Sequence, residues 1–233
     1  MKRSLLGLGV FMALASCDAP TRSAPQSSPQ VIERVTRTGS PQSVGDFRAV
    51  VARVEPVAER VCRQMRPGAN CDFSISIDTR PNQPPNAFQT YNEAGRPLLV
   101  MTPSLLKRMK NRDEVAFVVA HEAAHHIASH IDQTQRTAVT GALIGAVFGA
   151  AIGLDPTGVD TATNIGGNIG ARRFSKDFEL EADSLGARIA QRAGYNPLRG
   201  VLYFQDASDP GDRFLGTHPP NASRIQNVRN SVR

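Results

Sequence analysis

The sequence contains no tryptophan and no cluster in which Lys or Arg alternates with aromatic side chains. Nucleic-acid-binding proteins usually carry such a basic surface, so the net charge of +6 does not point to a nucleic-acid partner. The charge falls to +4 when Lys2 and Arg3 are left out. We interpret the remaining excess as solvated surface, although it could also hold a protein near an anionic membrane.

No hydrophobic run near the start is long enough to span a bilayer in the mature protein. The run from Ser4 to Ser16 follows a short basic start and ends in L-A-S-C, whose cysteine is Cys17. This end resembles the lipobox of a bacterial lipoprotein, in which the acylated cysteine becomes the new N-terminus. An ordinary cleaved signal with a chance cysteine is the alternative. The sequence therefore predicts a lipoprotein signal peptide over residues 1–17 and a lipid anchor at Cys17.

Cysteine is scarce, and only Cys62 and Cys71 remain once Cys17 is assigned to lipid. In an exported protein such a pair is most simply a disulfide. The pair has no Cys-x-x-Cys spacing and no adjacent histidine, which argues against a metal site. We predict a disulfide that clips the end of a helix to the following strand.

The chain is long enough for one sizeable domain and an N-terminal extension. Residues 18–43 are rich in Pro, Ser, Gln and Thr and are predicted to be a flexible tether, so the folded domain should cover residues 44–233. Apolar periodicity predicts an α+β fold that is mainly helical, with a polar loop before residue 174. The predicted helices cover residues 45–65, 103–110, 113–133, 174–193, 198–205 and 222 onwards, and the predicted strands cover residues 71–78, 87–91 and 97–102.

One internal segment, Ala138 to Leu154, has no charge and carries glycine at every fourth residue. These glycines share one helix face and permit close approach of another helix. Seventeen residues are marginal for a bilayer span. We therefore favour a helix packed within the domain or against a partner over membrane insertion. The segment lies between two motif-bearing helices and could also act as a lid.

The sequence H-E-A-A-H runs from His121 to His125 within a predicted helix. Residues four apart on a helix are about 40° apart around the axis, so both imidazoles project to the same side and can bind one Zn²⁺. Glu122 lies beside them, where it can accept a proton from water. Two histidines that are ordinary hydrogen-bonding residues would be the alternative to a metal site.

A catalytic zinc normally has three protein ligands. His126 is rotated by about 100° around the helix axis from His125, so it points in another direction. His130 is half a turn out of phase and would face away on an unbroken helix. Zincins with three histidines carry Gly after the second histidine and a further histidine at the tenth place, but Ala128 and Ile131 occupy those positions here.

The remaining candidates are carboxylates on the later helix. Glu179 and Asp183 are four residues apart and share a face, whereas Glu181 points away from both. One of the pair could bind zinc while the other orients a ligand imidazole. A solvated acidic helix face is the alternative.

Four motifs occur in order along the chain: H-E-A-A-H, F-E-L-E-A-D, A-G-Y-N-P and T-H-P-P-N-A-S-R-I. In this the chain resembles the zinc metallopeptidases that include HtpX and the CAAX prenyl proteases, and most closely the small BepA-like periplasmic or lipoprotein members. The resemblance covers about Phe73 to Ile225. It implies a zincin domain of the gluzincin type, with a small β-sheet beside the H-E-x-x-H helix.

The resemblance also implies roles for individual residues. His121, His125 and Glu179 would bind one Zn²⁺, Glu122 would be the general base, and Asp183 would support a ligand histidine.

Further residues match family positions around this centre. His218 matches a histidine that approaches the metal and either stabilises the oxyanion or plugs the site, and Arg224 matches an arginine near the acidic residues. The N-A-F sequence at Asn86, Ala87 and Phe88 matches one before the sheet edge and is assigned to substrate binding. The several transmembrane helices of the membrane-embedded members are lacking, which argues against prenylated substrates.

These features predict a membrane-anchored zinc metalloendopeptidase of the bacterial cell envelope. It would face the periplasm, be attached to the inner or outer membrane, and cleave unfolded or misassembled envelope proteins in quality control. Strand 97–102 or strand 87–91 would pair with an extended peptide, unless this hairpin only covers the core. The alternatives are a chaperone-like or assembly-binding lipoprotein with a latent zinc site, and a purely structural lipoprotein.

Overall fold

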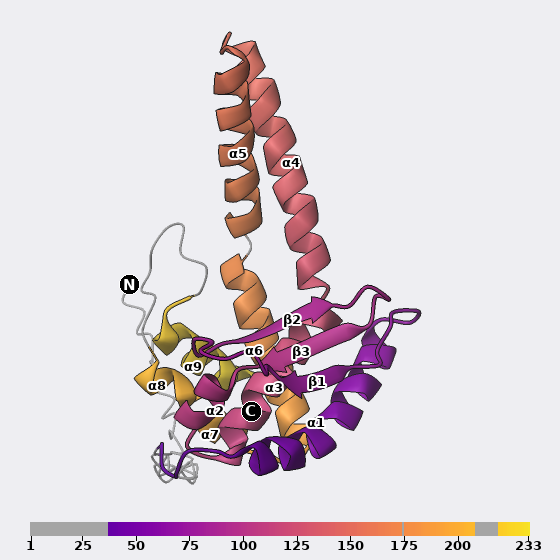
Figure 1. Cartoon of the computed structure of the whole chain (residues 1–233), viewed down its shortest axis with the longest axis vertical. Coiled ribbons are helices and arrows are strands. Elements are labelled where there is room, and N and C mark those ends of the chain that lie inside the picture. Colours follow the sequence, from indigo (N-terminus) through magenta and orange to yellow (C-terminus); the bar gives the residue numbers. More distant parts are fainter. Residues whose placement is uncertain (1–36, 174, 208–218) are drawn as a thin grey trace, which may run out of the picture. The chain divides into compact units, whose positions relative to one another are not determined.

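The helix that carries H-E-A-A-H lies at the centre of the domain, and the other elements position its side chains (Figure 1). The computed structural model describes residues 37–173, 175–207 and 219–233. The predicted signal peptide, Cys17, most of the predicted tether and His218 lie outside these residues.

Helices dominate the described residues, and a small sheet accompanies them, so the predicted α+β class is confirmed. The strands are β1 (Ser74–Ile77), β2 (Ala87–Tyr91) and β3 (Pro97–Met101). The helices are α1 (Val44–Met65), α2 (Pro103–Arg108), α3 (Arg112–Ile127), α4 (His130–Ala151), α5 (Pro156–Arg173), α6 (Ser175–Arg192), α7 (Pro197–Gly200), α8 (Tyr203–Asp206) and α9 (Asn221–Ser231).

The strand order in the sheet is β1-β3-β2. Strand β3 runs parallel to β1 and antiparallel to β2, with Phe88 opposite Val100 in the β2–β3 register. Because β3 has a neighbour on each side, the prediction that residues 97–102 could offer an edge to a peptide is wrong. Strand β2 is an edge of this sheet, and it contacts α3.

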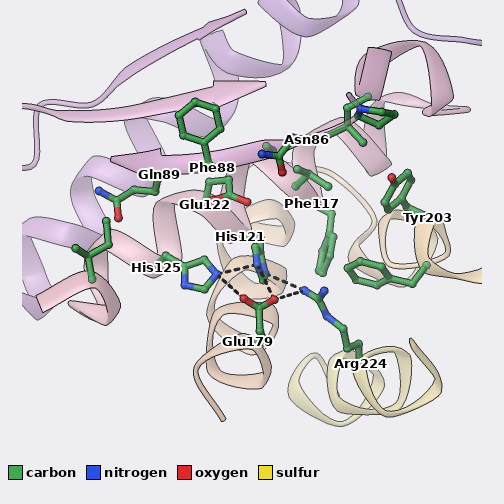
Figure 2. Close-up of a pocket in the computed structure, with 16 residues that line it drawn as sticks. Asn86, Phe88, Gln89, Phe117, His121, Glu122, His125, Glu179, Tyr203 and Arg224 are labelled. Carbon is green, nitrogen blue, oxygen red and sulfur yellow. Dashed lines mark hydrogen bonds and ion pairs between the residues drawn. The ribbon is translucent and has the colours of Figure 1, made fainter. Parts of the chain in front are cut away.

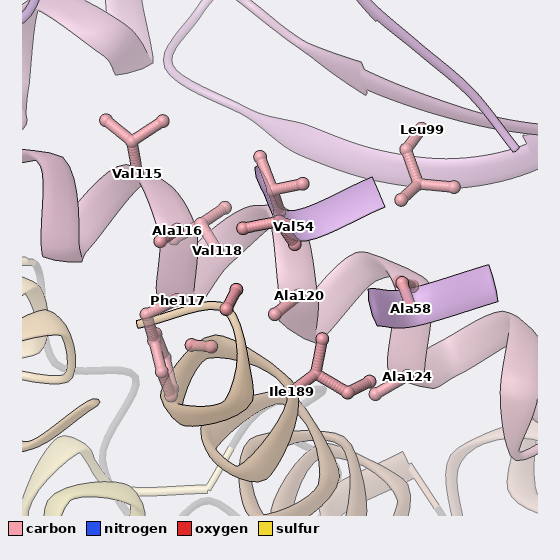
Figure 3. Close-up of a cluster of buried hydrophobic side chains, with 14 of the residues drawn as sticks. Val54, Ala58, Leu99, Val115, Ala116, Phe117, Val118, Ala120, Ala124 and Ile189 are labelled. Carbon is pink, nitrogen blue, oxygen red and sulfur yellow. The ribbon is translucent and has the colours of Figure 1, made fainter. Parts of the chain in front are cut away.

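Helix α3 begins at a well-formed N-cap and is buried on nearly all sides. The side chain of Asn111 accepts a hydrogen bond from the backbone N–H of Glu114, and the buried Glu114 carboxylate accepts hydrogen bonds from Asn111 and Arg37. Figure 3 shows side chains from α1, β3 and α6 around α3. A helix that is buried on nearly all sides belongs inside a core, and the H-E-A-A-H sequence is therefore held rigidly.

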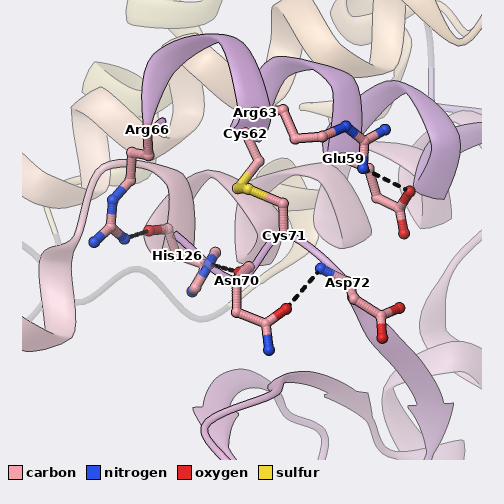
Figure 4. The surroundings of a disulfide bond; sticks show 8 residues. All are labelled: Glu59, Cys62, Arg63, Arg66, Asn70, Cys71, Asp72 and His126. Carbon is pink, nitrogen blue, oxygen red and sulfur yellow. Dashed lines mark hydrogen bonds and ion pairs between the residues drawn. A yellow bond between two sulfur atoms is a disulfide. The ribbon is translucent and has the colours of Figure 1, made fainter. Parts of the chain in front are cut away.

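Helix α1 is tied to the end of α3 by a disulfide loop. Cys62 and Cys71 form the predicted disulfide, with their Cα atoms 5.7 Å apart (Figure 4). Within this loop Arg66 donates to the carbonyl oxygen of His126 at 2.8 Å, and His126 Nε2 donates to the carbonyl oxygen of Asn70 at 2.8 Å. The loop thus fixes the last turn of α3, directly after His125.

The structure differs from the sequence prediction in two places between α3 and α6. The helix predicted over residues 113–133 is broken, because Ser129 adopts the left-handed conformation (φ 59°, ψ 33°) between α3 and α4. The polar loop predicted before residue 174 is the helix α5. Its apolar residues are too few for the helical periodicity to stand out, and only packing against α4 reveals it.

Helices α4 and α5 lie side by side as an antiparallel hairpin (Figure 1). A methyl group at Gly145 would lie 2.1 Å from the carbonyl oxygen of Ala162, and one at Gly166 would lie 2.1 Å from that of Gly141. The predicted close approach of a second helix to the glycine face is therefore confirmed, and α5 is that helix. No helix in the described ranges is both long and apolar enough to cross a bilayer.

Candidate metal centre

Helix α6 delivers its carboxylates to α3 because the two helices approach each other very closely. A Cβ atom at Gly186 would lie 2.8 Å from the backbone nitrogen of His121, closer than any real Cβ contact. Glycine at this position therefore sets the distance between the two helix axes. Glu179 lies two turns and Asp183 one turn before Gly186, on the side of α6 that meets the histidines.

The structure brings His121, His125 and Glu179 together, as the sequence predicts (Figure 2). The two Nε2 atoms of the histidines are 2.9 Å apart. The carboxylate oxygens of Glu179 lie 3.3 Å from His125 Nε2 and 3.6 Å from His121 Nε2. Two imidazole nitrogens and one carboxylate therefore converge on a common point.

This donor set fits a tetrahedral zinc ion with one position left open. Zinc ligands about 2.0–2.1 Å from the metal are roughly 3.3 Å from one another in a tetrahedron, close to the separations observed. The electrostatics also favour a cation. Burial by itself lowers the pKa of His121, but hydrogen bonds to Asp183 and Glu179 outweigh this effect and raise it to about 10. The surroundings of His121 thus stabilise positive charge.

Asp183 supports His121 from behind the metal position. Its Oδ1 atom lies 3.0 Å from His121 Nδ1, so Nδ1–H donates to it and Nε2 is left to face Glu179. Asp183 also accepts two hydrogen bonds from Arg224 of α9, at 2.7 and 2.8 Å. Burial raises the pKa of the Asp183 carboxyl, but Arg224 and His121 lower it more, and Asp183 is held as a carboxylate.

Arg224 is itself buried and links both carboxylates of α6. Its Nη2 atom lies 3.2 Å from Glu179 Oε2, and its guanidinium carbon lies 3.9 Å from the ring centre of Phe204. The predicted proximity of Arg224 to the acidic residues is confirmed. Arg224 positions Glu179 and Asp183 relative to each other.

The prediction that His130 faces away from the metal residues is wrong. The left-handed Ser129 turns the chain back, and His130 Nδ1 lies 2.9 Å from His125 Nδ1. The other ring nitrogen of His130 lies 3.2 Å from Glu181 Oε2, and the ring stacks on Phe178. No Gly or Pro marks this break, so the sequence offered no sign of it.

The contacts of His130 determine the proton positions along the hydrogen bonds that link His125, His130 and Glu181. If His125 presents Nε2 to a metal, its Nδ1 carries the proton and donates to His130 Nδ1. His130 Nε2 then carries its own proton and donates to Glu181. Burial and repulsion from His125 lower the pKa of His130, which keeps it neutral and able to accept. His130 and Glu181 thus support His125 as Asp183 supports His121.

We predict that His130→Phe weakens zinc binding by about 10- to 100-fold, the usual cost of removing an outer partner of a ligand histidine. Phenylalanine keeps the stacking on Phe178 but leaves His125 Nδ1 without an acceptor. Competition with a chromogenic chelator measures the affinity directly.

Glu181→Gln is the matched control, because its amide oxygen can still accept the hydrogen bond from His130. Its zinc affinity should stay within a few-fold of the unsubstituted protein. Equal affinities for His130→Phe and the unsubstituted protein would show that His130 does not orient His125.

A cavity of about 360 Å³ opens beside the three converging residues. The predicted substrate residues Asn86, Ala87 and Phe88 line one wall at edge strand β2, and Glu122 lines it beside His121 (Figure 2). The lining also includes aromatic side chains that sequence reasoning did not identify, namely Phe117, Tyr203 and Phe204. Helix α8 carries Tyr203 and Phe204, and its sequence contains no motif that marks it as part of a site.

The cavity and its converging side chains agree with the comparison to protein families. The model of peptidase family M48 matches residues 47–232, which include the sheet, α3, α6 and α9. A comparison with curated protein sequences finds no match. Since the family model covers most of the sequence, the chain belongs to peptidase family M48 and is a metallopeptidase.

Proposed function

We propose that this metallopeptidase is a zinc-dependent endopeptidase of the bacterial cell envelope, which hydrolyses peptide bonds in unfolded or misassembled envelope proteins. One observation carries the proposal: Glu122 and the three converging residues line the same cavity as edge strand β2. A base, three residues that can hold a metal ion and a strand that can pair with a peptide therefore face one space.

His121, His125 and Glu179 would hold the zinc ion, because two imidazoles and a carboxylate form a donor set typical of catalytic zinc. When bound, zinc supplies Lewis-acid chemistry that makes water a stronger acid and polarises a peptide carbonyl. The supporting groups Asp183 and His130 keep the two Nε2 atoms directed at that position.

Glu122 transfers a proton from water to the leaving nitrogen. Its carboxylate takes a proton from water as the water oxygen bonds to the carbonyl carbon of the substrate. It then gives the proton to the leaving nitrogen as the C–N bond breaks, so the acid product gains the OH and the amine gains the H. His218 is proposed either to donate to the oxyanion or to plug the site.

Strand β2 binds the substrate in this proposal. An extended peptide that adds to the outer edge of β2, where no strand of the described residues pairs, would run along the cavity past Phe88 and Glu122. Strand addition depends mainly on backbone hydrogen bonds, which folded proteins do not offer. The preferred substrates are therefore segments that have lost their structure.

The location in the envelope rests on the N-terminal sequence and on the disulfide. A lipid anchor at Cys17 would attach the enzyme to the inner or outer membrane, and the tether would let it reach substrates on the periplasmic side. The disulfide between Cys62 and Cys71 supports an oxidising compartment.

We expect purified protein to carry one zinc ion per chain and to cleave an unfolded test protein. Treatment with 1,10-phenanthroline should abolish cleavage, and added zinc should restore it. Metal content by mass spectrometry and product formation on gels provide the two measurements.

Other outcomes distinguish the alternatives. Stoichiometric zinc and binding of the test protein without cleavage would favour a chaperone-like protein with a latent site, and activation by His218→Ala would then identify His218 as the plug. A folded protein that binds no stoichiometric zinc would refute the proposal altogether.

A further inference from the structure

Helix α4 has two apolar faces, and only one of them is used within the described part of the chain. Its glycine face packs on α5 through Gly145 and Gly149. The opposite face carries larger side chains, each between 62% and 69% exposed. We call this set the α4 apolar face: Leu143, Ile144, Val147 and Phe148.

We propose that the α4 apolar face pairs with the same face of a second copy of this chain, in antiparallel orientation. A twofold axis would pass between residues 145 and 146. This arrangement would convert two α4–α5 hairpins into a four-helix bundle.

The order of side chains along the α4 apolar face is symmetric about that axis. Leu143 and Phe148 are equally distant in sequence from the point between residues 145 and 146. The same holds for Ile144 and Val147. In an antiparallel pair each of these side chains therefore lies level with a large side chain of the other copy.

The charges at the two ends follow the same symmetry. Residues 137–154 carry no charge, and the first charged residues beyond them are Arg136 and Asp155. Both are exposed and equally distant from the proposed axis. Antiparallel pairing places Arg136 of one copy near Asp155 of the other, whereas parallel pairing would place like charges together.

The apolar area corresponds to a weak, reversible dimer. A largely exposed Val, Leu, Ile or Phe side chain buries on the order of 60–100 Å² of apolar surface when it is covered. Four such side chains on each of two copies give roughly 500–800 Å², the size of a weak or transient interface.

A lipid surface fits this face less well. Helices that lie on anionic membranes are rich in Lys and Arg on their polar side. Between residues 137 and 171 the only charged residues are Asp155 and Asp160, so anionic headgroups would repel the hairpin. A second copy of the chain matches both the apolar surface and the charges.

Sedimentation velocity of the full chain carrying Cys17→Ser, which prevents acylation, tests the association. We expect a dimer whose fraction rises with concentration. Substituting both Leu143→Asp and Phe148→Asp should weaken it at least 100-fold, without unfolding the protein, because both side chains are exposed. Val44→Asp is the matched control, since Val44 is exposed on α1, and it should leave the dimer intact.

Cross-linking tests the orientation. Ile144→Cys and Val147→Cys are prepared separately in the same Cys17→Ser background and then mixed under mild oxidation. The antiparallel pair predicts that the mixture forms a covalent dimer at least tenfold faster than either variant alone. Faster self-cross-linking of each variant would indicate a parallel pair and overturn the proposal.

A monomer at all concentrations would also overturn it. So would a monomer that binds vesicles of phosphatidylglycerol through the α4 apolar face, because the face would then serve a membrane. A dimer that persists in the doubly substituted variant would place the contact elsewhere on the chain.

Discussion

Replacing Glu122 with Gln should lower kcat/KM for an unfolded protein substrate by about 10²- to 10⁴-fold, the range that a general base contributes. The amide has nearly the same shape as the carboxylate but cannot take a proton from water. Because Glu122 is not among the three converging residues, zinc content should remain at one ion per chain. Steady-state kinetics and metal analysis on the same preparation check both statements.

The control for this substitution is Glu59→Gln, the same change on α1, where the partly exposed Glu59 forms an ion pair with Arg63. It should leave kcat/KM unchanged. Loss of zinc together with activity in Glu122→Gln would mean that Glu122 holds the metal site together. An unchanged rate would remove Glu122 from the mechanism.

Replacing Asp183 with Asn should lower the free energy of unfolding by roughly 3 kcal/mol, the lower end of the cost of breaking a buried ion pair. The Asp183 side chain is fully buried and that of Arg224 is 7% exposed, so the guanidinium would lose its paired carboxylate without gaining water. Glu179 remains 3.2 Å from Arg224 and limits the loss. Urea denaturation of the metal-stripped protein measures this change in the free energy of unfolding.

The same substitution should also weaken zinc binding by about 10- to 100-fold, because His121 loses the acceptor that orients its ring. Asp72→Asn is the matched control: Asp72 pairs with Arg96 at the surface, and breaking such a pair costs less than about 1 kcal/mol. If Asp183→Asn and Asp72→Asn had equal effects on stability, the buried network would not contribute as described.

The sequence predicted much of the fold, because local patterns determine where most elements lie. The apolar periodicity of α1, the turn between β2 and β3 and the alternation in β1 all act within a few residues, and each element begins and ends within a few residues of its predicted bounds. The predictions failed where local pattern and tertiary contact disagree. Residues 156–173 carry little periodicity, yet packing on α4 makes them helical.

The candidate site was predictable to the extent that it depends on spacing along one helix. His121 and His125 are brought together by the pitch of α3 alone, and Glu179 and Asp183 share a face of α6 for the same reason. The contact between His125 and His130 was not predictable, because it depends on a left-handed residue, Ser129, at a position where an unbroken helix was equally compatible with the sequence.

The sequence by itself determined the chemical groups that this protein can offer: two imidazoles and a glutamate on one helix, and two carboxylates on another. These follow from helical geometry, which repeats every few residues regardless of the rest of the chain. The tertiary structure decided how they meet. The close approach of α6 at Gly186, the partners of Arg224, the edge position of β2 and the exposed face of α4 depend on contacts between segments far apart in the chain, and no local pattern encodes them.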